Sequence, residues 1–104
     1  MLQTIGFNSL EEQDLVDFHK LFSEYSQKIE RKIKNAVSFS IHVKEYKKLG
    51  ARKKFSIHIR AVAPTRIFEG EAWDWDFNRT LHKAFKKIEQ EIEHKFHVSD
   101  EHKR

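Results

Sequence analysis

Alternation of apolar and polar residues is strongest in two neighbouring segments in the middle of the chain. The apolar positions are Val37, Phe39, Ile41 and Val43 in the first segment, and Phe55, Ile57, Ile59 and Ala61 in the second. Because successive side chains of a β-strand point to opposite faces, this spacing predicts two half-buried strands. A turn signal around Gly50 joins them into an antiparallel hairpin.

One register of this hairpin keeps every apolar residue on the same face. It places Ile41 opposite Ile59 and His42 opposite His58. A shift by one residue would turn the apolar set of one strand towards solvent. The other face is left to polar side chains, which suit solvent or a partner: Ser38, Ser40, His42, Lys44, Ser56, His58 and Arg60.

The chain before the hairpin predicts a short strand and a long helix. Residues 3–7 form the strand, with Ile5 and Phe7 on one face. Ser9 and Glu12 have the spacing of a capping box, which marks the start of a helix. Apolar residues then recur at helical spacing up to the expected terminator, Asn35: Leu15, Phe18, Phe22, Tyr25, Ile29 and Ile33.

A third strand is expected at residues 67–73, and its apolar residues alone leave open which face is buried. One choice places Phe68 in the core and sets Glu69 opposite Arg60 on the polar face. The other choice buries two glutamates without partners, which costs on the order of several kcal/mol for each. The first choice is therefore the prediction. It leaves two large residues partly exposed, Ile67 and Trp73.

The C-terminal part of the chain predicts one long helix. Asp74 and Asp76 resemble a paired carboxylate, but one of them is expected to cap this helix, and Lys87 is placed to pair with Glu91 one turn on. The buried stripe of the helix is Phe77, Leu81, Ala84, Phe85, Ile88, Ile92 and Phe96. Residues 99–104 are expected to form a flexible tail.

The predicted order of elements is β-α-β-β-β-α. Each helix has one apolar stripe and the sheet has one apolar face, so both helices must cover the same face of the sheet. The expected fold is a two-layer α+β sandwich with a mostly antiparallel sheet. A chain of 104 residues suits one such domain, which we place at residues 1–98.

Positive charge is concentrated around the hairpin. Residues 31–66 carry eleven Lys or Arg and one Glu, although the whole chain has a net charge of only +4. Such a patch attracts polyanions, among which nucleic acid is the commonest, and the alternative is a solvated lysine-rich surface. The chain has no cysteine, no membrane-spanning apolar run and no signal-peptide pattern, so we expect a soluble cytoplasmic protein.

Motifs for catalysis and metal binding are weak. The chain has three glycines, no phosphate-binding glycine loop, no serine nucleophile motif and no HExxH segment. The densest histidine group is His94, His97 and His102, and its place near the C-terminus favours a solvated tail. His42 and His58 would supply two ligands, whereas zinc usually needs three or four. We expect no enzyme activity, no metal and no cofactor.

The candidate RNA-binding residues form two groups. The first lies on the hairpin and consists of Lys44, Lys47, Lys48, Arg52, Lys53, Lys54 and Arg60. The second lies on the last helix and consists of Arg79, Lys83, Lys86 and Lys87. Backbone phosphates need cations at several places and no particular base sequence, so we expect structured RNA to be bound by its shape. Tyr46 near the turn fits either stacking on a base or packing against lysine side chains.

The start of the last helix also resembles a known family. Residues 76–88 read Asp-Phe-Asn-Arg-Thr-Leu-His-Lys-Ala-Phe-Lys-Lys-Ile, with a capping acid, an aliphatic-rich stripe and two lysines, Lys83 and Lys87. In this frame, and in the order of its elements, the chain resembles the short forms of the ribosome hibernation-promoting factors. These are also described as ribosome-associated translation inhibitors or sigma-modulation proteins. Residues 24–29 resemble the end of the family's first helix, with Lys28 at its lysine position.

The resemblance implies a domain laid out like a double-stranded-RNA-binding domain. It also implies binding to the small ribosomal subunit in the channel used by mRNA and tRNA, which blocks translation in resting or stressed cells. The chain departs from the family after residue 88, where further cations are usual and this sequence has Glu89, Glu91 and Glu93.

Two functions of different classes are therefore expected from the sequence. The first is a ribosome-associated factor, monomeric in isolation, that binds small-subunit ribosomal RNA and inhibits translation. The second is a basic regulatory domain that binds an acidic protein partner without binding ribosomes. Neither involves a membrane or a small-molecule substrate.

Overall fold

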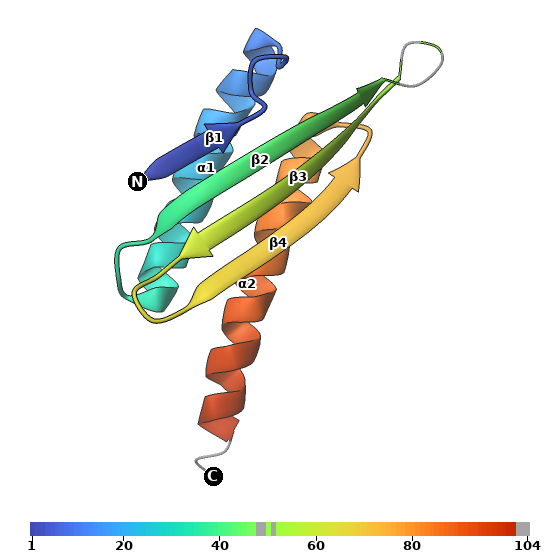
Figure 1. Cartoon of the computed structure of the whole chain (residues 1–104). Helices are drawn as coiled ribbons and strands as arrows, with labels where there is room; N and C mark the ends of the chain where they lie inside the picture. The colour runs from blue at the N-terminus through green and yellow to red at the C-terminus, as the bar shows by residue number, and fades with distance from the viewer. Residues whose placement is uncertain (48–49, 51, 102–104) are drawn as a thin grey trace.

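Two helices cover one face of a four-stranded sheet in the computed structural model (Figure 1). The structure describes residues 1–47, 50 and 52–101, with side chains described as far as residue 95. The elements are β1 (Leu2–Ile5), α1 (Glu12–Ile33), β2 (Ser38–Lys47), β3 (Lys53–Val62), β4 (Ile67–Asp74) and α2 (Phe77–Glu101). The predicted two-layer α+β fold and its order of elements are confirmed.

The strands lie in the order β1-β2-β3-β4, so β1 and β4 form the two edges of the sheet. β1 is parallel to β2, whereas β2, β3 and β4 are antiparallel to their neighbours. The sheet is thus mixed, with a single parallel pair among the described strands. This pair exists because α1 crosses over between β1 and β2, as a parallel connection requires.

The predicted register of the hairpin is confirmed. Ile41 pairs with Ile59, His42 with His58, and the isoleucines are completely buried. The predicted face of β4 is also confirmed, because Phe68 is buried while Glu69 lies opposite Arg60 on the open face. Because side chains alternate between the two faces of β4, Ile67 and Trp73 lie on the open face and are 45% and 53% exposed, as the sequence predicts.

An aromatic cluster joins the helices to the sheet. Phe22 of α1 contacts Phe39 of β2 with ring centroids 5.2 Å apart. Tyr25 of α1 stacks on Phe85 of α2 at 4.7 Å, and its hydroxyl forms a 2.8 Å hydrogen bond with Nδ1 of His82. Both helices therefore pack on the same core. The buried stripe of α1 also includes Leu21, which the predicted stripe omits.

The N-terminal segment differs from its prediction. β1 ends at Ile5, which is 43% exposed, and Phe7 lies beyond the strand with its ring 4.8 Å from that of Phe18. The two residues therefore do not share a strand face. The predicted Ser9 cap is also wrong, because Ser9 lies inside a turn in which the N–H of Leu10 donates to the carbonyl of Phe7.

Both ends of α1 lie close to, but not at, the predicted residues. Glu11 caps the helix, and its N–H donates to the Asp14 carboxylate at 3.4 Å. At the other end Lys34, not Asn35, adopts the left-handed conformation with φ 62°. Its N–H donates to the carbonyl of Glu30 at 2.7 Å, which satisfies one of the last free helical acceptors.

The last helix is longer than predicted. α2 continues to Glu101, so residues 99–101 of the expected tail are helical. In Figure 1 its C-terminal half extends beyond the end of the sheet. Phe96 of the predicted stripe, and His97 and His102 of the histidine group, lie outside the residues whose side chains are described.

α2 makes a close backbone approach to β4 at Gly70. A methyl group at this position would overlap the carbonyl oxygen of Ala84 and come within 3.1 Å of the Ile88 side chain. The absence of a Cβ at residue 70 is therefore what allows α2 to lie directly against the edge strand.

The Gly70→Ala substitution is expected to lower the free energy of unfolding by about 1–3 kcal/mol, as overpacking does, because backbone cannot move aside as a side chain can. Denaturant unfolding measures this change. Ser40→Ala on the open face of β2 serves as the control and should change stability by less than about 0.5 kcal/mol. Equal stability of the Gly70→Ala variant and the wild type would contradict the close approach.

Candidate nucleic-acid interface

Not all of the hairpin cations that the sequence predicts to bind RNA are free of partners within the protein. The Lys53 ammonium lies 3.7 Å from the Glu45 carboxylate and 3.9 Å from that of Glu11. Lys44 is exposed on the open face of β2, and Lys47 is exposed at the end of this strand. Lys48 lies outside the described residues.

Arg52 and Lys54 each lie against a tryptophan. The Arg52 guanidinium carbon is 4.3 Å from the ring centroid of Trp75, and the Lys54 ammonium is 4.4 Å from that of Trp73. Cations at this distance are attracted by the negative face of the ring. The Lys54 ammonium is also 6.0 Å from the centroid of the Tyr46 ring, which is the contact with a lysine that the sequence gives as one alternative for Tyr46. Stacking of Tyr46 on a base stays a prediction.

The two tryptophans connect the hairpin cations to those of α2. Their ring centroids are 6.0 Å apart and the rings are perpendicular. Trp73 is the last outward-facing residue of β4, and Trp75 follows in the connection to α2. The hairpin and the helix thus form one surface, with the tryptophan pair between them.

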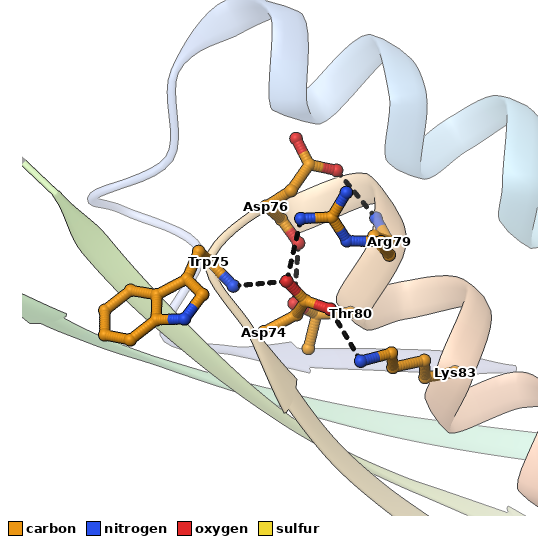
Figure 2. Close-up of polar contacts among 6 residues, drawn as sticks. All are labelled: Asp74, Trp75, Asp76, Arg79, Thr80 and Lys83. Atoms are coloured by element: carbon orange, nitrogen blue, oxygen red, sulfur yellow. Dashed lines mark hydrogen bonds and ion pairs between the residues drawn. The ribbon is translucent and has the colours of Figure 1, made fainter.

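Asp74 lies between the tryptophans in the sequence, and the alternation of β4 turns it to the face opposite Trp73. Its carboxylate points towards α2 (Figure 2). One oxygen accepts a hydrogen bond from Nη2 of Arg79 at 3.0 Å, and the other accepts from Nζ of Lys83 at 2.6 Å. The N–H of Trp75 also donates to this carboxylate at 2.6 Å. Only 10% of the Asp74 side chain is exposed, whereas the side chains of Arg79 and Lys83 are 61% and 51% exposed.

These donors control the ionisation of the aspartate. The hydrogen bond from Arg79, and then that from Lys83, hold the pKa of Asp74 well below its ordinary value of 3.8. The same contact raises the pKa of Arg79. Asp74 therefore stays charged and fixes the ends of both cationic side chains, while the exposed parts of these side chains remain open to solvent.

Asp76, not Asp74, caps α2. Its carboxylate accepts a 2.8 Å hydrogen bond from the N–H of Arg79, and its carbonyl accepts a 2.6 Å bond from the hydroxyl of Thr80 (Figure 2). Of the two aspartates that the sequence leaves as alternatives, one is thus a helix cap and the other anchors two cations.

A groove of about 1060 Å³ runs along the free edge of β4, between this strand and α2. Its lining includes both tryptophans and the four cations predicted on α2, which are Arg79, Lys83, Lys86 and Lys87. The Lys87 ammonium donates to the backbone carbonyl of Glu71 at 2.6 Å, across the edge of the sheet. This contact replaces the predicted pair between Lys87 and Glu91.

Two of the predicted residues lie apart from this groove. Lys28 is exposed on α1, with its ammonium 5.4 Å from the ring centroid of Tyr25. Arg60 is exposed on the open face of β3, between Ser40 and Glu69 of the neighbouring strands. Neither lines the groove. Of the predicted cations, the four of α2 line the groove, and Arg52 and Lys54 contact the tryptophans that line it.

The tryptophans are the site residues that sequence reasoning missed. A signal was present, because the predicted face of β4 leaves Trp73 exposed, and tryptophan is enriched among the residues that dominate binding energy at interfaces. The position of Trp75 against Arg52 had no such signal, since it depends on the path of the chain after β4.

Comparison with models of known protein families gives no match for this chain, and comparison with curated proteins gives none either. Within the described part of the chain, no helix is both long and apolar enough to cross a membrane. Nor do three His, Cys, Asp or Glu side chains gather as metal ligands among these residues.

The low pKa of Asp74 predicts how stability depends on pH. An aspartate whose pKa is lower in the folded state stabilises the protein fully above its unfolded pKa of about 3.9, and this stabilisation is lost as the pH falls towards the folded pKa. The free energy of unfolding of wild type should therefore fall more steeply than that of Asp74→Asn below about pH 5.

Chemical denaturation of both proteins between about pH 2 and pH 7 measures this difference. The wild type should be the more stable protein at pH 7, and the difference in free energy of unfolding between the two proteins should shrink as the pH falls below about 5. Parallel curves over the whole range would show that Asp74 is not held by Arg79 and Lys83. Asp17→Asn, at a half-buried position of α1 where the carboxylate accepts a 3.0 Å hydrogen bond from the Gln13 side chain, is the control.

Proposed function

We propose that this protein binds structured RNA of the small ribosomal subunit and thereby inhibits translation in resting or stressed cells. The protein acts by occupying its site as a cytoplasmic monomer, without catalysis. The observation that carries this proposal is the single surface on which the hairpin cations, the tryptophan pair and the α2 cations lie together.

Cations without partners in the described part of the chain also support the proposal. Among the described residues no hydrogen bond or ion pair engages the side chains of Lys44, Lys47 or Lys86. Their charge is not neutralised within the protein, so it is available to phosphates. Several such cations release counterions from RNA on binding, which provides affinity without base recognition.

The acidic second half of α2 is compatible with this function. Glu89 and Glu93 lie 3.9 Å and 2.8 Å from the ammonium of Lys32 on α1. These two glutamates therefore serve the contact between the helices. The first half of α2, which carries the cations of the groove, is the part that we assign to RNA.

The resemblance of residues 76–88 to the hibernation factors points to the same partner. Lys83 and Lys87 occupy the lysine positions of that family, and both line the groove. Lys83 is fixed by Asp74 and Lys87 by the carbonyl of Glu71, so their ammonium groups have defined positions. Fixed cations suit a partner of fixed shape, such as folded ribosomal RNA.

The triple variant Lys44→Gln, Lys47→Gln, Lys86→Gln tests the proposal without breaking a described contact. Its affinity for purified small subunits, measured by co-sedimentation, should be lower than that of the wild type. The slope of log affinity against log salt should also fall, by roughly 0.7–0.9 for each phosphate that the variant no longer neutralises.

A matched control removes the same charge elsewhere. The variant Lys20→Gln, Lys34→Gln, Arg66→Gln changes exposed residues that do not line the groove, and it should keep the affinity and salt slope of the wild type. Identical behaviour of both triple variants and the wild type, or absence of small-subunit binding at low salt, would contradict the proposal. If the protein does not bind small subunits at low salt but does bind an acidic protein, the alternative function, a basic regulatory domain with an acidic protein partner, would be favoured.

A further inference from the structure

Binding to the RNA backbone does not explain the tryptophans. Phosphates are neutralised by cations, and an indole ring contributes nothing to this interaction. Trp73 is nevertheless 53% exposed, which keeps a large apolar side chain in contact with water. The Lys54 ammonium lies against its ring, and Trp73 is part of the lining of the groove.

We propose that the groove between β4 and α2 binds an unpaired nucleotide of the RNA, with the base stacked on Trp73. This inference rests on the proposed function and names the part of the RNA that the groove recognises. The phosphates on either side of the base bind the cations of α2, of which Lys83 and Lys86 line the same groove.

The composition of the groove fits this ligand. A nucleotide has a flat apolar base and a negatively charged group, and the groove offers an indole ring from β4 and ammonium groups from α2. Its volume of about 1060 Å³ lies just above the roughly 300–1,000 Å³ of small-ligand sites. A base therefore fits together with its sugar and the neighbouring phosphates.

The arrangement around Trp73 and Trp75 assigns them different roles. The Arg52 guanidinium lies against the ring of Trp75, which lines the groove and is less exposed than Trp73. Trp73, the more exposed ring, provides the stacking surface. Lys54 lies over its ring at 4.4 Å and holds the indole in place by a cation–π contact.

Duplex RNA cannot make this contact, because its bases are already stacked and only unpaired bases can be splayed out onto an aromatic side chain. The groove therefore distinguishes RNA with an unpaired nucleotide from fully paired RNA. The cations alone would bind both forms.

The experiment compares two RNA stems of equal length, one fully paired and one with a single bulged nucleotide. The ratio of their dissociation constants is the measured quantity. Stacking of one base contributes enough that wild type should prefer the bulged stem by roughly 5- to 100-fold. Trp73→Leu should abolish this preference, and Trp73→Phe, which keeps an aromatic ring, should retain most of it.

Fluorescence gives a second readout, because both tryptophans of the chain lie at this site. In a Trp75→Phe background the remaining emission comes from Trp73 alone. A base stacked on this ring should quench its emission when the bulged stem binds. The paired stem should leave the emission close to that of the free protein. Ile67→Ala, at the other end of β4, controls for a general effect of removing an exposed apolar side chain.

The outcomes separate this inference from the proposed function. Equal, salt-dependent affinity of the wild type for both stems would overturn the nucleotide site and leave RNA binding intact. Unchanged preference in Trp73→Leu, or emission that does not respond to the bulged stem, would also overturn it. Failure to bind either stem would overturn both proposals.

Discussion

The contact between Gly70 of β4 and the backbone of α2 determines the geometry of the whole functional surface. Because residue 70 has no Cβ, the helix lies directly against the edge strand. The polar side of its first half is thereby placed beside the open edge of the sheet, where Lys87 reaches the carbonyl of Glu71. A bulkier residue at position 70 would move this row of cations away from Trp73, and the groove would lose one of its walls.

Asp74 makes the second connection between β4 and α2, and it couples stability to the site. A buried carboxylate without partners is costly, whereas this one has two cationic donors and one backbone donor. The same contacts hold Arg79 and Lys83 at the mouth of the groove. Their side chains remain more than half exposed, so they still present donors to a ligand. One carboxylate thus organises two cations without removing them from the interface.

The sequence predicted those parts of the molecule in which the burial pattern has a strict period. Long alternating runs determine the β2–β3 register, and two glutamates determine the face of β4. β1 has only four residues, which is too few for such a pattern. Ser9 lies inside the turn that ends at Leu10, so it is not at the start of α1 and cannot cap it. Likewise, the sequence identified the candidate RNA-binding cations, but only tertiary contacts determine which of them lack a partner within the protein. Lys53 meets Glu11 from a distant segment, and Arg52 meets Trp75 after the chain has passed through β4.

The choice of which β4 residues face the core explains why the tryptophan site lies at the end of this strand. If the opposite set of β4 side chains faced the core, Trp73 would be buried and Asp74 exposed, which is the better arrangement for these two residues taken alone. It would also bury Glu69 and Glu71, and Glu69 pairs on the open face with His58 at 2.9 Å. Two unpaired buried glutamates cost more than one exposed indole and one aspartate that is fully hydrogen-bonded. The strand therefore ends with an apolar residue in water and a charged residue in the core. Local preference and global fold conflict here, and such conflicts are typical of functional sites.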